Sequence, residues 1–169
     1  LAQARLVKNW TLRGTLHIFP EEHQALYLDP DLYRSHDWTI PDFWNSRPDW
    51  SLSPQRQELF TQVILNALSG GPQTREQLKD LCRTQGMTPA EESSLFHPWG
   101  GGIRQLCQRG FLHYAVREEK TLCLSRLIPP LSREKSALSR VKRALVHTCP
   151  TTVHDLMYFF RASSTQVKG

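Results

Sequence analysis

The sequence has 169 residues, of which 39% are hydrophobic, and its formal net charge is +5. This length allows one domain or two small ones, with enough apolar residues for small helical cores. No apolar run approaches the length of about eighteen residues that a membrane helix needs, and the first residues lack the features of a signal peptide. These properties argue against a membrane protein and lead us to expect a soluble, cytoplasmic one.

The chain is predicted to begin with the end of a helix followed by a strand. Residues 1–8 are compatible with a helix tail, and residues 10–18 alternate between apolar and polar side chains as a strand does. One face of this strand, with Trp10 and Ile18, is predicted to be core. The other face carries the polar residues Thr11, Arg13, Thr15 and His17.

A short helix and a long connector are predicted next. Pro20 is followed by two glutamates, and this pattern is typical of a helix start; the helix is expected to run to about Leu28. Residues 29–50 contain three prolines and no clear periodicity. We interpret them as an irregular connector whose aromatic residues pack it against the neighbouring units: Trp38, Phe43, Trp44 and Trp50.

The central stretch has the signals of a complete structural unit. Ser53 and Pro54 predict the start of a helix to Leu68, with an apolar stripe that includes Leu59, and the segment 70–72 is a stop signal. Thr74 with Gln77 forms a capping box for a second helix, which ends near residue 86 and buries the side chains Leu78, Leu81 and Cys82.

The same unit continues with a third helix and a hairpin. After an irregular stretch, residues 102–109 are predicted to form a helix that buries Ile103, Leu106 and Cys107. The glycine run 100–102 before it either exposes backbone donors to a phosphate or is a flexible lead-in, and the second is more common. Residues 111–116 and 121–124 are predicted as two strands joined by a turn. Three helices followed by a hairpin is the order of a winged helix.

The C-terminal part repeats the first half of this unit. A helix is predicted over residues 133–147, with Leu138, Val141 and Leu145 inward, and a second helix follows Thr152 with Leu156, Met157, Phe159 and Phe160. The predicted fold class is therefore mainly α with small β-hairpins, an α+β fold of tandem winged helix-turn-helix units. The predicted domains are 1–50, the end of a first winged helix plus the connector, 51–128, a complete second one, and 129–169, the start of a third. Because the first and third copies are partial, we expect the chain to be an excerpt of a longer protein.

Charge and cysteine placement bear on the class of partner. Residues 126–169 carry eight Lys and Arg against two Asp and Glu, which is compatible with nucleic acid or with a solvated basic helix face. The four cysteines, Cys82, Cys107, Cys123 and Cys149, form no Cys-x-x-Cys pair. We therefore expect reduced thiols, no bound metal and, in the absence of a nucleotide motif, no cofactor.

The segment Trp10-Thr11-Leu12-Arg13-Gly14-Thr15-Leu16-His17-Ile18 resembles the Arg-Gly-Thr-Leu-His stretch of the winged-helix DNA glycosylase family of AlkZ-like and YcaQ-like proteins. Residues 71–74 and 150–156 are similar in order and spacing to that family's second and third winged helices. The resemblance implies three tandem winged helices that form a basic concave channel, and removal of bulky alkylated or cross-linked bases from DNA in base excision repair, a hydrolase reaction.

One part of the family pattern is missing from residues 1–169. The family's catalytic motif, Gln-aliphatic-Gln or Gln-aliphatic-Asp, lies upstream of the Arg-Gly-Thr-Leu-His stretch. Cleavage of an N-glycosidic bond requires a group that positions water at the sugar carbon, so no catalytic residue is assigned here. Gln55-Arg56-Gln57 has a similar spelling but sits at a helix start, and we interpret it as ordinary first-turn residues.

The resemblance, the winged-helix order and the basic C-terminal helix together predict a set of DNA-binding residues. Arg13 and His17 would contact the DNA backbone or support the missing catalytic segment, with pairing to acids such as Glu21 as the structural alternative. The third helix would face the major groove and the wing would touch phosphate, unless these are a solvated helix face and a neutralised turn. The remaining predicted DNA contacts are Arg104, Gln105, Gln108, Arg117, Lys120, Arg133, Arg140, Lys142 and Arg143.

Three functions are weighed on this basis. The first is a DNA repair glycosylase that binds double-stranded DNA, as a monomer associated with the nucleoid when bound. The second is a non-enzymatic tandem winged-helix regulator in which Arg104 and Gln105 read bases, which predicts sequence preference without lesion preference. The third is a protein-interaction module, favoured if the third helices are buried against neighbouring copies.

Overall fold

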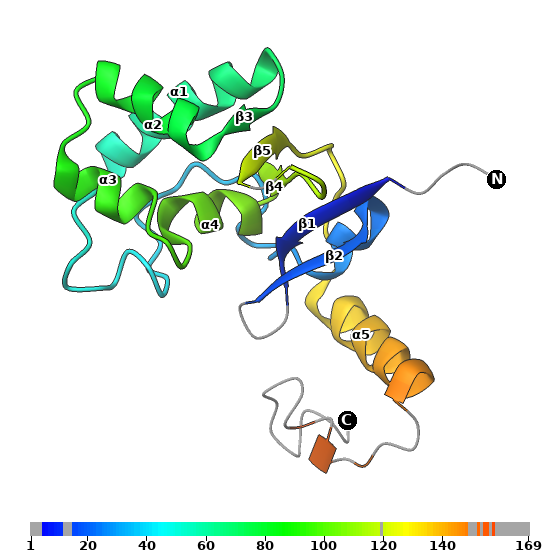
Figure 1. Ribbon diagram of the computed structural model, residues 1–169. Coiled ribbons are helices and arrows are strands. Elements are labelled where there is room, and N and C mark those ends of the chain that lie inside the picture. Colours follow the sequence, from blue (N-terminus) through cyan, green and yellow to red (C-terminus); the bar gives the residue numbers. More distant parts are fainter. Residues whose placement is uncertain are drawn as a thin grey trace.

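A computed structural model of the chain describes residues 5–11, 15–118, 120–148, 152, 154, 155 and 157, except for the side chains of 143–148. Helices α1, α2 and α3 lie together at one end, the strands lie in the middle, and α5 extends from the other end (Figure 1). None of the helices in the described ranges is long and apolar enough to cross a membrane.

The N-terminal strands form a hairpin, which corrects two predictions. β1 (Leu6–Trp10) pairs antiparallel with β2 (Leu16–Pro20), so residues 6–8 belong to a strand and not to a helix tail, and residues 10–18 are not one strand. Trp10 and Leu16 are paired across the hairpin and lie on the same face of it. The alternation of apolar and polar residues therefore continues through the turn, and the sequence pattern does not reveal that the chain reverses there.

The most buried residues of this hairpin lie on the face opposite the predicted one, although Trp10 packs against the core as predicted. Val7 is fully buried and Phe19 nearly so, whereas Ile18 is 54% exposed. In a strand, successive side chains point to opposite faces, so a wrong strand boundary exchanges core and surface. The next element, the 3-10 helix η2 (Glu21–Leu26), begins after Pro20 as predicted but is tighter than an α-helix.

The two helices with clear capping signals agree with the prediction. α1 (Pro54–Ser69) begins after Ser53, whose side chain accepts a hydrogen bond from the Arg56 backbone N–H. α2 (Arg75–Thr84) begins at the capping box of Thr74 and Gln77. Their buried faces are narrower than predicted, because Leu59 and Leu81 are 39% and 40% exposed.

An additional helix, which was not predicted, occupies the stretch that was expected to be irregular. α3 (Pro89–Leu95) has its own capping box, in which Thr88 caps the Glu91 backbone N–H and the Glu91 side chain caps Thr88 in return. The Glu91 carboxylate also accepts a 2.6 Å hydrogen bond from Arg56 Nε. This charge-assisted bond is the main reason why the pKa of Glu91 falls to about 2, and it ties α3 to the start of α1.

The strands of the first two predicted units form one sheet. β4 (Leu112–Tyr114) and β5 (Thr121–Leu124) are the hairpin predicted after Gly110, and β3 (Gln73–Thr74) pairs with β5. The described strands are ordered β2-β1-β4-β5-β3, and the junction between the units is Lys8 opposite Tyr114. Asn9 strengthens this junction by donating to the Leu112 carbonyl across 3.4 Å.

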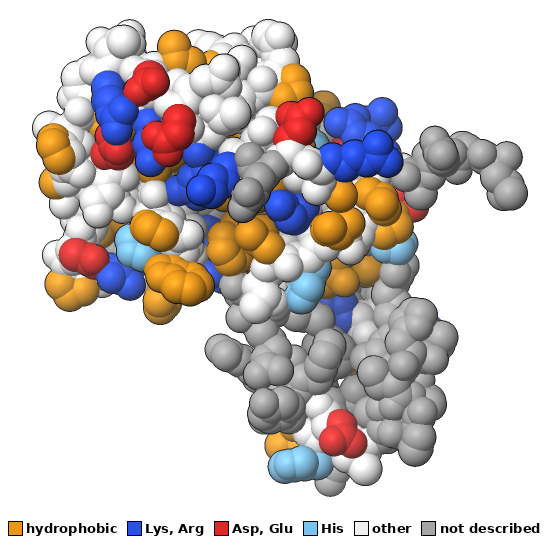
Figure 2. Space-filling model, in the orientation of Figure 1, with side chains coloured by type: hydrophobic (Ala, Val, Ile, Leu, Met, Phe, Trp, Pro, Cys, Tyr) orange, Lys and Arg blue, Asp and Glu red, His pale blue; other side chains and the backbone are white. Residues whose placement is uncertain are grey.

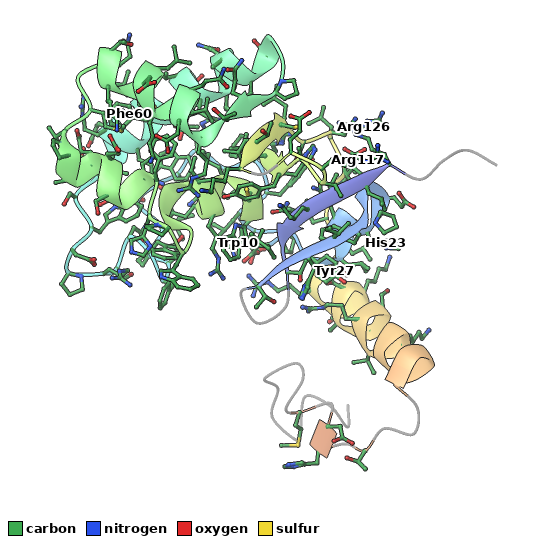
Figure 3. All side chains as sticks on the ribbon, in the orientation of Figure 1. Trp10, His23, Tyr27, Phe60, Arg117 and Arg126 are labelled. Atoms are coloured by element: carbon green, nitrogen blue, oxygen red, sulfur yellow. The ribbon has the colours of Figure 1, made fainter. Side chains whose placement is uncertain are left out.

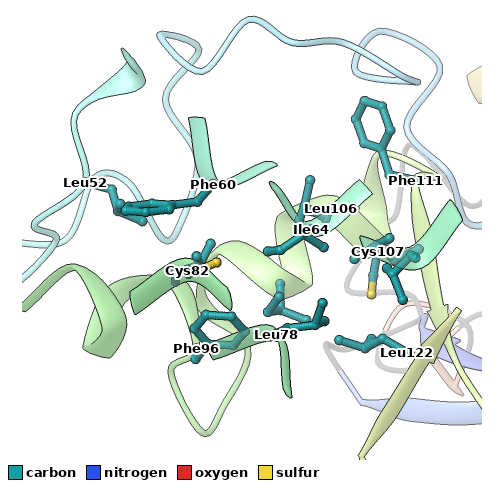
Figure 4. Close-up of a cluster of buried hydrophobic side chains, with 14 of the residues drawn as sticks. Leu52, Phe60, Ile64, Leu78, Cys82, Phe96, Leu106, Cys107, Phe111 and Leu122 are labelled. Carbon is teal, nitrogen blue, oxygen red and sulfur yellow. The ribbon is translucent and has the colours of Figure 1, made fainter. Parts of the chain in front are cut away.

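The core lies between α1, α2, α3, α4 (Gly101–Gln108) and the sheet (Figure 4). Phe60 and Ile64 of α1 are fully buried, as is Leu78 of α2. Cys82 and Cys107 are free thiols in this core, and burial raises the pKa of Cys82 to about 12. A thiol held protonated in an apolar core is unreactive, in agreement with the prediction that these two cysteines behave as small hydrophobic residues.

The C-terminal helix packs against η2. α5 (Arg133–Thr148) begins where predicted, and Ser136 Oγ donates a 2.6 Å hydrogen bond to the Leu26 carbonyl. Leu138 is 56% exposed, so its predicted inward position is wrong in the described part of the chain. Beyond α5, Thr152 and Asp155 exchange capping hydrogen bonds at the start of a helical turn. The predicted inward position of Leu145 and the predicted helix residues Leu156, Phe159 and Phe160 lie outside the described side chains.

Candidate nucleic-acid interface

Described residues form a cleft of about 630 Å³, which we call the arginine cleft. Its walls are the end of η2 with the following connector, the outer face of α4, and the first turns of α5. Five of the predicted DNA-binding residues line it, although they are far apart in the sequence: Arg104, Gln105, Gln108, Arg133 and Arg140. Four arginines face two carboxylates here, so the lining has an excess of positive charge.

Arg104 is half-buried on α4 and stacks on an aromatic ring of the neighbouring strand. Its guanidinium carbon lies 4.7 Å from the centre of the Trp10 ring, at the end of β1, where Figure 3 labels Trp10. Burial lowers the pKa of Arg104, and the nearby Asp42 carboxylate opposes that shift. Arg104 Nε has no hydrogen-bond partner among the described residues. The stacking fixes the side chain through a cation–π contact and leaves nitrogen donors unused.

Gln105 does not face solvent, which corrects the prediction that it faces the major groove. Its side chain is only 1% exposed. The amide oxygen accepts a 2.5 Å hydrogen bond from Gln57 Nε2, and the amide nitrogen donates to Asp42 Oδ2 across 2.6 Å. The connector folds over α4 and places Asp42 against this residue, so Gln105 joins α1, α4 and the connector instead of presenting a donor to a base.

The end of α4 contributes Gln108 and Arg109. Gln108 is half-buried on the cleft wall. Arg109 is 1% exposed, stacks on Trp38 at 4.1 Å, and donates from Nη1 to the Ser35 and Asp37 carbonyls. Its Nη2 has no partner among the described residues, and burial lowers its pKa. Arg109 therefore brings a buried positive charge under the cleft.

The basic residues of α5 have different environments. Arg133 donates to Asp29 at 3.3 Å and to Asp31 at 2.5 Å, so its charge is already neutralised by the connector. Arg140 is half-buried beside Tyr27, and burial lowers its pKa. Lys142 is exposed. The side chain of Arg143 lies outside the described residues.

The polar residues of the first hairpin gather at its tip. His17 is exposed on β2, and its ring nitrogens hydrogen-bond to Thr11 Oγ1 and Thr15 Oγ1. Arg13, the other predicted residue, lies outside the described residues. Glu21, the acid considered as a structural partner, pairs with Arg5 at 3.7 Å and with Arg126 at 3.3 Å.

The wing of the second unit carries exposed cations beside a second hollow. Arg117 and Lys120 are exposed between β4 and β5, as predicted for wing residues. On the face shown in Figure 2, Lys and Arg side chains gather near the start of β1, where Figure 3 places Arg117 and Arg126. Arg117 lines a hollow of about 600 Å³ with Arg5 and His113. Burial lowers the pKa of His113 to about 4, so this histidine is neutral at pH 7.

Two sequence features have structural roles. Arg56 pairs with Glu91 and donates to the Gly86 carbonyl, and Gln57 is buried, so Gln55-Arg56-Gln57 is not a set of solvated first-turn residues. The glycine run before α4 allows close packing, because a Cβ on Gly102 would lie 2.6 Å from Leu95 Cδ1. Neither feature belongs to the cleft lining.

Sequence reasoning missed Arg109, Asp42 and Phe43 as cleft residues. An arginine in the last turn of a helix ordinarily complements the helix dipole, so Arg109 gave no signal of its own. Asp42 follows Pro41 in a loop, where acids commonly cap the backbone, and it does accept from the Trp44 and Asn45 backbone N–H groups. Phe43 was predicted to pack inward, but 70% of its side chain is exposed. Exposed aromatic side chains often mark contact surfaces.

The described helices and sheet form the α+β fold expected for winged-helix units. The chain belongs to the AlkZ-like family of DNA glycosylases, whose family model matches residues 1–169. The curated interstrand DNA cross-link repair glycosylase of Streptomyces sahachiroi is 25% identical over 112 residues, which are 66% of this chain and 29% of that protein. The solved structure of Streptomyces sahachiroi DNA glycosylase AlkZ has a TM-score of 0.61 and 23% identity, over 96% of this chain and 46% of that one. The chain thus spans less than half the length of these relatives.

Proposed function

We propose that this chain is the DNA-holding part of a glycosylase that excises bulky alkylated or cross-linked bases. The family assignment carries the proposal, because it covers the whole sequence, and a related protein is named for repair of interstrand DNA cross-links. The arginine cleft supports it, since half-buried arginines with unused donors suit a phosphodiester backbone. His17 and Arg13 are proposed to contact the backbone or to support the catalytic segment of the intact protein.

DNA contact is proposed to be mostly independent of sequence. Gln105 is buried and Arg104 is stacked on Trp10, so two of the three α4 residues expected at the major groove are held by the protein itself. Exposed cations on the wing and on α5 are available for phosphate: Arg117, Lys120 and Lys142. Phosphate contacts position DNA without reading its sequence, whereas a repair enzyme needs selection by the lesion. This weighs against a regulator that reads bases with α4.

A protein-interaction module is the second candidate, and one observation favours it. The outer face of α4 is covered by Trp10 of the first hairpin and by the connector at Asp42. That candidate predicts that α4, the third helix expected from the sequence, packs against neighbouring units. Duplex binding measured at physiological salt separates the two, because nonspecific attraction between a basic chain and DNA is screened there and an interaction module retains no dedicated DNA contacts.

The proposed activity is tested by base release from alkylated duplex. The intact protein that contains this chain is expected to release a bulky alkylated purine and to leave an undamaged duplex of the same sequence intact. The released base is quantified by chromatography. A protein that binds one preferred undamaged sequence tightly and releases no base would contradict the glycosylase proposal and favour a regulator.

The backbone contacts are tested by the salt dependence of duplex binding. Lys142→Gln is expected to reduce the slope of log affinity against log salt by about 0.9, the effect of one lost phosphate contact. Arg133→Gln is the matched control on the same helix and should reduce it less, because Asp29 and Asp31 already neutralise Arg133. Both slopes are obtained by fluorescence anisotropy at salt concentrations from about 50 to 200 mM. An unchanged slope for Lys142→Gln would remove Lys142 from the interface.

A further inference from the structure

The arginine cleft contains three half-buried or buried cations that lack a carboxylate partner. Arg104, Arg109 and Arg140 form no ion pair with a described residue, in contrast to Arg133. Arg104 Nε and Arg109 Nη2 also lack any hydrogen-bond partner among the described residues. A buried charge without a partner is costly in a folded protein, so a group of such charges around one cleft indicates an anion that binds there.

The carboxylates in the cleft lining act on Arg104 and Arg109 only at a distance, through the charge of Asp42, and bond to neither of them. Asp42 Oδ1 accepts from the backbone N–H groups of Trp44 at 2.7 Å and Asn45 at 3.0 Å, and its Oδ2 accepts from Gln105 at 2.6 Å. Asp29 is held by Arg133. The lining therefore retains positive charge on one wall, on Arg104 from α4 and Arg140 from α5, with Arg109 beneath.

The connector in the cleft lining presents an aromatic ring to solvent. Phe43 is 70% exposed, yet its ring is supported edge-on by Trp44, with centroids 5.3 Å apart and planes at 87°. Trp44 is itself held between His97, at 5.0 Å, and the guanidinium of Arg47, at 5.5 Å. A supported, exposed aromatic ring beside arginines is the combination with which proteins bind unpaired nucleic-acid strands, because every base has a face that stacks.

We propose that the arginine cleft binds one nucleotide of an unpaired DNA strand, with its phosphate at Arg104 and Arg140, above the buried charge of Arg109, and its base stacked on Phe43. The volume of about 630 Å³ lies within the range of ligand clefts, roughly 300–1,000 Å³. A base stacked within a duplex has no free face for Phe43, whereas a base beside a bulky or cross-linked lesion has weakened pairing. The inference rests on the proposed function, since it assumes a DNA partner, and adds which form of DNA the cleft selects.

The test compares single-stranded and duplex DNA by fluorescence anisotropy with the 169-residue chain. Phe43→Ala is expected to weaken binding of a labelled thymidine oligomer about tenfold, within the range for loss of one base stack, and to leave duplex affinity within about twofold. Trp99→Ala is the matched control, because Trp99 is 76% exposed but does not line the cleft. Arg140→Gln should weaken the oligomer and reduce its salt slope by about 0.7.

The outcomes separate this inference from the proposed function. Unchanged oligomer affinity in Phe43→Ala, or an equal loss in Trp99→Ala, would overturn the cleft assignment while duplex binding remains. Displacement of the oligomer by free deoxyadenosine monophosphate at micromolar concentration would assign the cleft to free nucleotides and overturn the strand assignment. Absence of binding to both single strand and duplex at low salt would overturn the proposed function as well. Circular dichroism of each variant checks that the fold is retained.

Discussion

Replacing Gly101 by alanine is expected to destabilise the fold by roughly 3–5 kcal/mol, enough to remove most of the stability of a small domain. Gly101 opens α4 with a φ of +58°, and a Cβ there would lie 2.1 Å from the Ser94 carbonyl oxygen and 2.9 Å from His97 Cβ. The backbone of α3 cannot move away without breaking its packing on α4. Urea unfolding, followed by circular dichroism, measures the shift of the midpoint.

Gly86 provides the matched control for this prediction. It also has a left-handed backbone, with φ of +74°, but a Cβ there meets no atom within 4 Å. Gly86→Ala therefore carries only the conformational penalty, about 1 kcal/mol. Equal unfolding midpoints for the two variants would show that α3 and α4 do not approach as closely as the structure has them.

Gln105→Ala is expected to cost roughly 2–3 kcal/mol of folding free energy and to leave duplex affinity unchanged. The substitution removes the donor to Asp42 and the acceptor of Gln57, and Gln57 is only 1% exposed, so its amide is left without a partner in the core. Thermal unfolding gives the stability change, and anisotropy at a temperature where the variant is folded gives the affinity.

Gln108 is the control on the same helix, one turn further on. It is half-buried on the cleft wall, and Gln108→Ala should change stability by no more than about 0.5 kcal/mol. The base-reading interpretation predicts the opposite pattern for Gln105→Ala, with full stability and an affinity loss of about 1–3 kcal/mol that depends on the DNA sequence. That pattern would restore α4 as a recognition helix.

Elements with a local chemical signal could be predicted from the sequence. Ser53 and Pro54 start α1, and Thr74 with Gln77 starts α2, because a cap satisfies backbone donors within a few residues of itself. The same signal, Thr88 with Glu91, precedes α3. That helix was missed because its seven residues carry too few apolar side chains to show a helical period.

Which face of a helix or strand is buried was less predictable than where that element lies in the sequence. The N-terminal hairpin buries Val7 and Phe19 and exposes Ile18, which is the reverse of the face read from alternation. Its pairing partner is β4, more than a hundred residues along the chain, and register against a distant strand leaves no local trace. The predicted domain boundaries stay a prediction.

The candidate site shows the same division. Sequence reasoning selected Arg104, Gln108 and Arg140, because basic and polar residues on a helix face are visible in the helical period. It could not predict that Gln105 is buried, since Asp42 reaches it only when the connector folds across α4.

By itself, the sequence determined α1, α2, α4 and α5, the caps of α1 and α2, the wing hairpin and the family, because each depends on residues close together in the chain or on a contiguous motif. Only the tertiary structure decided that the strands of the first two predicted units share one sheet. Only the tertiary structure decided, too, that arginines from α4 and α5 line one cleft, where Arg133 pairs with carboxylates and Arg104 and Arg140 do not. The burial of a side chain and the pairing of its charge depend on neighbours from distant segments of the chain. A local sequence pattern does not contain those neighbours.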